Sequence, residues 1–280
     1  MSLHTSSVLV KLTVKQWDGF KKDKRVSDRV DEEYKTAGNA GNYNKRLLDK
    51  STLAPIQKLV GKIRQEHARL TMPWCYDGVS LLPAKLYFEY TELMRDLKDR
   101  FDDQVSNLIQ QYPIYKAQQA TKLGTLFSPD DYPANDDLKH RFEVSHLFFP
   151  VPQSEHFIVD LAADDAAKMR DDLTRELQNT QTMALQSLYT RVRDIVEHVH
   201  ERLSDPENIF RDSMIANVQQ LVDVLPGLNV FNDETLNKVC RELKDKVLIC
   251  DAQDLRHDRE LREQMAMDAF DIVSLLKGPN

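Results

Sequence analysis

The best candidate for a metal site is a Glu and His pair on one predicted helix. Glu197 and His200 are three residues apart, a spacing that di-iron helical bundles use for their ligands. Such a centre needs a second pair of this kind, and the other one, Glu143 and His146, falls in a predicted strand. His198 and His200 lie about 200° apart around a helix, so they cannot bind one ion together. We interpret these side chains as solvated and expect neither a metal nor another cofactor.

Motifs for nucleophilic catalysis and for phosphate binding are missing from the sequence. No G-x-S-x-G motif occurs, and Cys75, Cys240 and Cys250 have no catalytic signature around them. The glycine cluster at 38–42 lacks both the Lys-Ser/Thr of a P-loop and the third glycine of a dinucleotide-binding motif. Acidic pairs such as Asp102-Asp103 act as catalysts only in a pocket that shifts their pKa values. We therefore predict no catalytic residues and a protein that is not an enzyme.

Charge is distributed unevenly along the chain. Residues 1–70 contain 15 Lys and Arg against 8 Asp and Glu, whereas the other 210 residues contain 23 against 37, so the balances are +7 and −14. A basic segment of this kind indicates a surface for nucleic acid or another acidic partner. Trp17, Phe20 and Tyr43 lie beside the cations and could stack on bases. The candidate binding residues are Lys21, Lys22, Lys24, Arg25, Lys45 and Arg46.

A simpler interpretation of the same charges is structural. The cations could lie on solvated helix faces, with the basic segment docked on the acidic helices of its own chain. We favour this interpretation because charge runs are common and the sequence pI of 5.7 is far below the value of about 9 expected of a dedicated nucleic-acid binder.

The elements that must position these residues are mostly helical. Apolar residues recur every three or four positions over 84–112 and 164–204, which predicts helices of roughly 40 and 60 Å at 1.5 Å per residue. The longer helix needs a partner, which we expect to be the helix at 84–112 or a second copy of the chain. Further helices are expected at 53–70, after Pro206, near 234–247 and at 255–276.

Strand patterns occur in only two places. Residues 8–14 alternate apolar and polar side chains, and 142–149 with 157–161 predict a hairpin around a prolyl-rich loop. The expected fold class is α+β and predominantly helical. Long antiparallel helices form a bundle or coiled-coil-like array beside a small antiparallel β-sheet, which the N-terminal strand and the mid-chain hairpin build. We divide the chain into an α+β region, 1–161, and an acidic helical region, 162–280.

The segment between the helices at 53–70 and 84–112 is a candidate interaction loop. Trp74, Tyr76 and Asp77 lie in it, followed by Gly78. Exposed aromatic residues there would indicate a partner site. The alternative is a hydrophobic plug that fixes the angle between the two helices, and we favour the plug because aromatic residues dominate core energetics.

Several segments together resemble the DUF3150 proteins, a family of uncharacterised proteins of bacteriophages and mobile elements. The segments are TVKQWDGFKKDKRVSDRV at 13–30, GNYNKRLL at 41–48, MPWCYDGVSLLPAKLYFEYTELM at 72–94, LFSPDDYP at 126–133 and RLSDPENIFRDSMIANVQQLVDVLPGLN at 202–229. The resemblance covers most of the chain and includes no known catalytic residue. It implies a non-enzymatic accessory protein that works with a MoxR/CobS-like AAA+ ATPase and a CobT-like von Willebrand factor A adaptor in DNA metabolism or assembly. The alternative is a direct DNA-binding protein that uses the basic N-terminal 70 residues.

Composition narrows the cellular setting. No window approaches the roughly 18 consecutive apolar residues of a membrane span, and the first residues lack the layout of a secretory signal. Three distant cysteines are typical of reduced thiols. We expect the protein to be located in the cytoplasm of the bacterial host and to have no membrane partner. It could form an oligomer.

Overall fold

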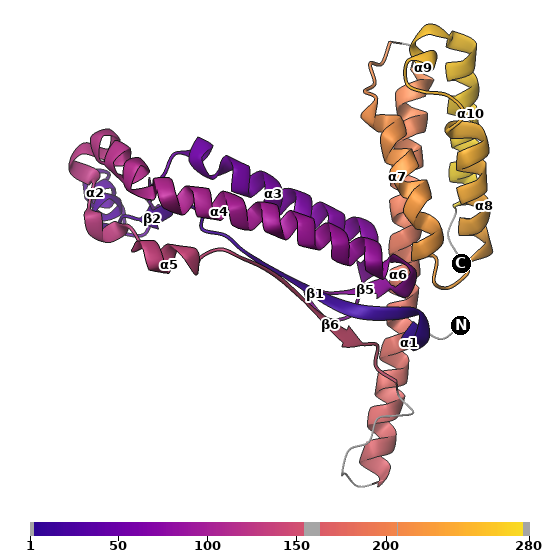
Figure 1. Ribbon diagram of the computed structural model, residues 1–280, viewed down its shortest axis with the longest axis horizontal. Helices are drawn as coiled ribbons and strands as arrows, with labels where there is room; N and C mark the ends of the chain where they lie inside the picture. Colours follow the sequence, from indigo (N-terminus) through magenta and orange to yellow (C-terminus); the bar gives the residue numbers. More distant parts are fainter. Residues whose placement is uncertain (1–2, 154–162, 206, 277–280) are drawn as a thin grey trace. The chain divides into compact units, whose positions relative to one another are not determined.

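The structure is a computed structural model that describes residues 3–153, 163–205 and 207–276 (Figure 1). Its fold is α+β and predominantly helical, with a small antiparallel sheet, which confirms the predicted fold class. The helices are α1 (Leu3–Ser6), α2 (Lys24–Glu33), α3 (Lys50–Leu70), α4 (Tyr87–Leu123), α5 (Asn135–Lys139), α6 (Ala163–Ser204), α7 (Ser213–Leu228), α8 (Glu234–Glu242), α9 (Asp254–His257) and α10 (Arg259–Leu275). The strands are β1 (Ser7–Lys15), β2 (Phe20–Lys22), β3 (Asn44–Arg46), β4 (Met72–Pro73), β5 (Val79–Pro83) and β6 (Glu143–Pro150). Short 3-10 turns cover Ala84–Leu86 (η1), Gly124–Leu126 (η2) and Pro129–Asp131 (η3), and a π-helical turn covers Leu243–Val247 (η4).

The chain forms two compact units. Unit 1 consists of residues 1–11, 67–91 and 147–280, and unit 2 consists of residues 12–66 and 92–146. These units interleave in sequence, and the division into regions 1–161 and 162–280 stays a prediction. The physical reason is that β1, α3, α4 and β6 are each continuous through a boundary between the units.

A four-stranded sheet has the order β4-β5-β1-β6. β1 is antiparallel to β5, with Leu9 opposite Leu81, and β4 is antiparallel to β5. The predicted N-terminal strand and the first strand of the predicted hairpin are therefore confirmed as β1 and β6. The predicted partner strand at 157–161 lies outside the described residues. The β4–β5 hairpin was missed because two residues of β4 are too few to show a period of two.

α3 and α4 run antiparallel beside each other (Figure 1). In unit 2, Lys122 near the end of α4 forms an ion pair with Asp49, directly before α3. In unit 1, the His67 ring lies 2.9 Å from the Tyr90 hydroxyl and 3.1 Å from the Ser80 hydroxyl, and so joins both helices to β5.

α4 is longer than the sequence indicated. It continues to Leu123 through Pro113, where we expected the helix to end. Proline removes one intrahelical hydrogen bond, and this loss is tolerated because the preceding Tyr112 is buried in the core of unit 2 and donates to the Pro133 carbonyl oxygen at 3.2 Å.

The C-terminal part of unit 1 is a bundle around α6, whose bounds agree with the predicted helix at 164–204. α10 packs antiparallel along it, with His200 Nδ1 donating to the Ala266 carbonyl at 2.9 Å and Arg262 Nε to the Leu203 carbonyl at 3.2 Å. α10 is thus the partner that α6 has within unit 1, where we had expected the helix at 84–112 or a second copy. α7 approaches η1 so closely that a Cβ on Gly227 would lie 2.7 Å from Leu86 Cδ2.

Within the described ranges, no helix is both long enough and apolar enough to cross a membrane.

Candidate nucleic-acid interface

A two-stranded ribbon in unit 2 carries four of the six predicted binding cations. β2 and β3 are antiparallel, with Phe20 opposite Arg46 and Lys21 opposite Lys45. Gly19 turns the chain into β2 at a φ of 71°, a left-handed conformation that side chains disfavour. The Arg46 guanidinium carbon lies 4.5 Å from the centre of the Phe20 ring, so cation and aromatic ring already form one stacked pair.

Lys45 is not available to a partner, which corrects the prediction for this residue. Only 3% of it is exposed, and its ammonium group donates to the Leu126 carbonyl at 2.8 Å. It also forms ion pairs with Asp23, at 3.2 Å, and with Asp131. Lys21 is partly engaged in the same cluster, 2.9 Å from Asp131. Tertiary contacts with a loop some 85 positions away in the sequence, which no local pattern reveals, bury this lysine.

The pKa values of Lys45, Asp23 and Asp131 are shifted in the directions that keep all three side chains charged. Hydrogen bonding from the Val26 N–H, opposed by burial and aided by Lys45, lowers the pKa of Asp23. Burial alone would lower the pKa of Lys45 and raise that of Asp131, but their mutual hydrogen bond and attraction reverse both effects. All three groups therefore remain charged through the neutral range.

α2 carries its charges against the helix dipole. The side chain of its N-cap, Asp23, accepts from the Val26 N–H, yet the first helical turn begins with Lys24 and Arg25 and contains no acid. The last turn contains acids and no base. Cations near a helix N-terminus are destabilising by tenths of a kilocalorie per mole each. Lys24 and Arg25 therefore do not stabilise α2 through its dipole, although Arg25 attracts the carboxylate of the N-cap Asp23 and helps to lower its pKa.

Three of the exposed cations on β2 and α2 lack the kind of carboxylate partner that Lys21 has in Asp131. Lys22, Lys24 and Arg25 are exposed, and none of them forms a salt bridge with any residue that the structure describes. Lys24, Arg25 and Arg29 line a groove of about 790 Å³ between α2 and η2, together with Asp28 and Glu32. The sequence hypothesis overlooked Arg29, although its position one helical turn after Arg25 was the signal that could have identified it.

The predicted interaction loop belongs to unit 1. It forms the turn between β4 and β5, in which Trp74 is 5% exposed and Tyr76 is 52% exposed. Asp77 is exposed beside Gly78, which has a φ of 72°. Trp74 thus occupies the core position that the plug interpretation assigns to it, while Tyr76 and Asp77 face solvent. This loop and the basic residues of β2 and α2 belong to different units.

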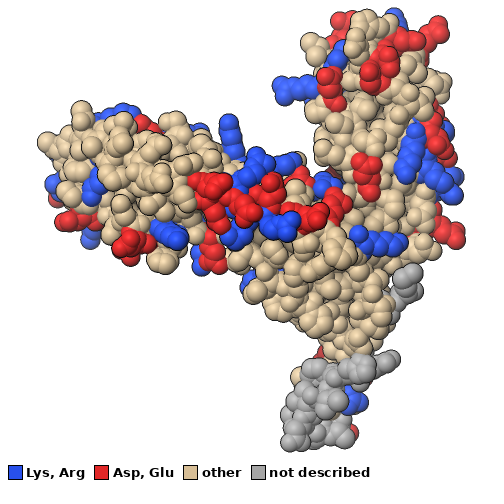
Figure 2. All heavy atoms as spheres, in the orientation of Figure 1, with Lys and Arg blue, Asp and Glu red and all other residues tan. Residues whose placement is uncertain are grey.

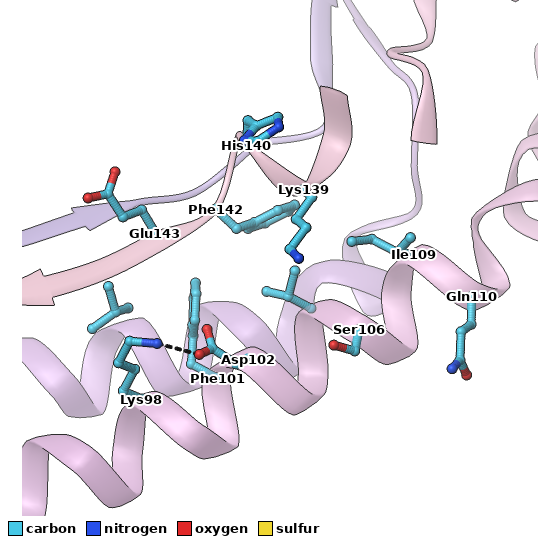
Figure 3. A pocket seen from close by; sticks show the side chains of 12 residues that line it. Lys98, Phe101, Asp102, Ser106, Ile109, Gln110, Lys139, His140, Phe142 and Glu143 are labelled. Atoms are coloured by element: carbon cyan, nitrogen blue, oxygen red, sulfur yellow. Dashed lines mark hydrogen bonds and ion pairs between the residues drawn. The ribbon is translucent and has the colours of Figure 1, made fainter. Parts of the chain in front are cut away.

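A pocket of about 770 Å³ lies between α4 and the segment from α5 to β6 (Figure 3). Its floor is apolar, with Phe101 and Phe142 in an edge contact at 6.4 Å. Figure 3 shows Lys139 reaching toward α4, while His140 and the Glu143 carboxylate point away from it. His140 and Glu143 therefore do not converge with Lys139 in this pocket. Among the described residues, no group of three or more His, Cys, Asp or Glu side chains could hold a metal ion.

The surface of α4 does not extend the basic surface of unit 2. Lys98 pairs with Asp102, and Arg100 lies 3.6 Å from Asp96, each one helical turn apart. Figure 2 shows blue and red side chains intermingled over the region that α3 and α4 occupy in Figure 1. The two charges of each of these pairs neutralise each other, unlike those of Lys22, Lys24 and Arg25.

The fold and the site together define a helical α+β protein with a basic, aromatic-flanked surface. No protein-family model, curated protein or solved structure matches the chain significantly. The resemblance to the DUF3150 proteins therefore stays a prediction.

Proposed function

We propose that this protein is a non-enzymatic accessory protein that acts by binding macromolecules, and that the exposed cations of β2 and α2 bind nucleic acid. The placement of Lys24 and Arg25 in the first turn of α2 carries the proposal. These side chains oppose the helix dipole and have no salt-bridge partner among the described residues, so their charge is available to phosphates.

Aromatic and electrostatic features nearby support this function. Phe20 is 37% exposed and stacks on Arg46. Tyr43, which directly precedes β3, is 39% exposed. Stacking aromatics beside backbone-binding cations are typical of proteins that bind single-stranded nucleic acid. Unit 2 has 20 Lys and Arg against 18 Asp and Glu, a balance of +2, in a chain whose net charge is −7.

Fluorescence anisotropy with labelled single- and double-stranded oligonucleotides over a salt series tests the proposal. The decisive variant is Lys22→Glu/Lys24→Glu/Arg25→Glu. We expect wild-type affinity to fall steeply with salt, by about 0.7 in log–log slope for each single-strand phosphate contacted, and the variant to lose most of its binding and slope. Folding should survive, because acids at the start of α2 suit its dipole.

The matched control is Lys238→Glu/Lys244→Glu in unit 1. Both lysines are exposed, and this variant changes the charge of the chain by four units, against six for the basic-surface variant. It should bind as the wild type does, apart from a small effect of net charge. Equal losses in both variants, or no binding by the wild type at low salt, would refute nucleic-acid binding.

A protein partner is the second candidate function, and exposed apolar side chains in unit 1 favour it. Phe88 is 77% exposed, and Leu147 and Phe149 on β6 are 61% and 42% exposed. By the family resemblance, the partner we propose is a MoxR/CobS-like AAA+ ATPase or its CobT-like adaptor. Size-exclusion chromatography of the purified proteins tests it, and Leu147→Glu/Phe149→Glu should abolish co-elution while the basic-surface variant should not.

A further inference from the structure

A pocket in unit 1 is lined by cations and hydrogen-bond donors and, among the described residues, by no acidic side chain. Its volume is about 490 Å³, within the range of small-molecule sites. It lies between the C-terminal end of α6 and the start of α7, two helices that are in contact (Figure 1). The polar side chains that line it are His198 and Arg202 of α6, Arg211 of the connecting segment, and Ser213 and Asn217 of α7.

The spacing of these residues follows the helix repeat on both sides of the pocket. His198 and Arg202 are four residues apart on α6, so they share one face of that helix. Ser213 and Asn217 are four residues apart on α7 and likewise share a face. Met214, which also lines the pocket, is only 4% exposed, so part of the wall is fixed in the core of the bundle.

The two arginines of the lining have no partner that competes with a ligand. Arg202 and Arg211 are exposed, and neither side chain forms a salt bridge or hydrogen bond with any residue that the structure describes. The carboxylate next in sequence, that of Asp212, is paired with Arg256 at 2.5 Å. A guanidinium group presents a planar fork of donors that fits two oxygens of one phosphate group.

Two other arginines fix the segment that carries Arg211. Arg262 Nη2 donates to the Asn208 carbonyl oxygen at 3.0 Å, and Arg256 Nη2 donates to that of Phe210 at 3.1 Å. The guanidinium carbons of both arginines lie 5.3 Å from the centre of the Phe210 ring, which is 5% exposed. The segment is therefore held in place without the side chain of Arg211, whose charge is available to a ligand.

We propose that this pocket is an anion site that binds a small ligand through a phosphate group, with Arg202 and Arg211 contacting the phosphate oxygens. Ser213 and Asn217 donate further hydrogen bonds from α7, and the imidazole of His198 donates from α6. Two positive charges without an acid in the lining match the charge of about −2 on a phosphate monoester at neutral pH. The site belongs to unit 1, so the inference goes beyond the nucleic-acid binding proposed for unit 2 and does not depend on it.

Isothermal titration of the full-length protein with pyrophosphate, at low salt and in a phosphate-free buffer, tests the site. The decisive variant is Arg202→Gln/Arg211→Gln, which removes both charges and keeps polar side chains of similar length. We expect saturable binding by the wild type and an affinity at least about tenfold lower in the variant, because its charge-assisted hydrogen bonds are lost. The melting temperature should not change, since both arginines are exposed and unpaired.

The matched control is Arg170→Gln/Arg241→Gln, which makes the same change of charge at two other exposed arginines of unit 1. Neither of these arginines forms a salt bridge with a described residue, and the variant should bind pyrophosphate as the wild type does. The basic-surface variant Lys22→Glu/Lys24→Glu/Arg25→Glu should also retain this binding, apart from a small effect of net charge. Binding that is lost in the basic-surface variant and kept in Arg202→Gln/Arg211→Gln would place the anion in unit 2 and overturn the inference.

A nucleoside triphosphate, titrated in the same way, distinguishes two sources of the phosphate group. An affinity equal to that of pyrophosphate would indicate an inorganic anion, whereas tighter binding would indicate that the rest of the pocket holds the nucleoside. In both cases Arg202→Gln/Arg211→Gln must weaken the binding. Absence of saturable binding of either probe, or equal losses in this variant and in Arg170→Gln/Arg241→Gln, would refute the site and leave the proposed nucleic-acid binding untouched.

Discussion

The two units use the same cationic side chains in different ways. In unit 1, arginines hydrogen-bond to backbone carbonyls at helix ends: Arg191 reaches Arg69 and Thr71, both at 3.0 Å, and Arg262 reaches the end of α6. In unit 2, the cations of α2 stand at the wrong end of their helix and have no such partner. Unit 1 has 18 Lys and Arg against 27 Asp and Glu, yet Arg191 and Arg262 stabilise its fold. Position relative to helix ends, rather than net charge, therefore distinguishes structural cations from those available for binding.

Unit 2 also contains the exception that sharpens this comparison. Lys45 comes from the basic segment, but burial and two carboxylates make it structural. Its neighbour Arg46 is exposed and stacks on Phe20. Adjacent residues on one strand thus belong to different functional classes because they face opposite sides of the ribbon.

The largest effect is expected from Lys45→Met. The variant leaves Asp23 and Asp131 without their shared cation in a mostly buried cluster, which should cost about 3 kcal/mol of unfolding free energy in urea denaturation. Lys22→Met, at an exposed and unpaired position, should change stability by less than about 0.5 kcal/mol. A Lys45→Met protein of wild-type stability that has lost nucleic-acid binding would make Lys45 a binding residue after all.

Two glycines inside helices give the next largest contrast. Gly227→Ala places a methyl group against Leu86 in unit 1, and such overpacking costs about 1–3 kcal/mol. Gly61→Ala on α3 in unit 2 meets no atom within 4 Å, and should stabilise by about 0.5–1 kcal/mol through helix propensity. Thermal melting of both variants checks the pair, and equal shifts would mean that α7 does not approach η1 as closely as described.

The ion cluster of Lys45 should also give a pH signature. The pKa values of Asp23 and Asp131 are lowered on folding, so the stability they contribute is present above about pH 4, the ordinary carboxyl value, and is lost as the pH falls further. At the alkaline end, burial raises the pKa of Tyr132 to about 12, which adds a loss of stability above about pH 10.

Denaturation of wild type and Lys45→Met across this range measures the acid effect as the difference between the two proteins. The difference should be constant from about pH 5 to 9 and shrink below about pH 4, because protonated carboxyls no longer need the lysine. A difference that stays constant down to pH 2 would show that the carboxylates are not responsible.

The smallest expected effect is on α2 itself. Lys24→Glu/Arg25→Glu should raise the stability of the protein by roughly 0.3–1 kcal/mol per charge, since acids suit the start of a helix. A slightly higher melting temperature with lost nucleic-acid binding is the outcome that separates binding cations from structural ones. A lower melting temperature would instead place both cations in the structural class.

Local patterns in the sequence determined the helices of this protein. The period of three and four residues gave α6 to within one residue of its bounds, because helix formation depends on neighbours a turn apart. α4 was predicted as a helix, but its continuation past Pro113 was not, since the contacts of Tyr112 that compensate for the proline come from residues 132 and 133. The basic character of the N-terminal segment was likewise readable from composition alone.

Only the tertiary structure decided which of these charges are available. The burial of Lys45 depends on Asp131, 86 positions later in the chain, and on the Leu126 carbonyl, 81 positions later. The sequence patterns likewise did not predict that β4 pairs with β5 or that β5 pairs with β1, and these pairings are known only from the folded sheet. Periodicity in the sequence indicates which face of a helix or strand is buried. Desolvation and ion pairing of a charged side chain depend on the residues that the folded chain packs against that face. Those residues are distant in the sequence, so local patterns do not identify them.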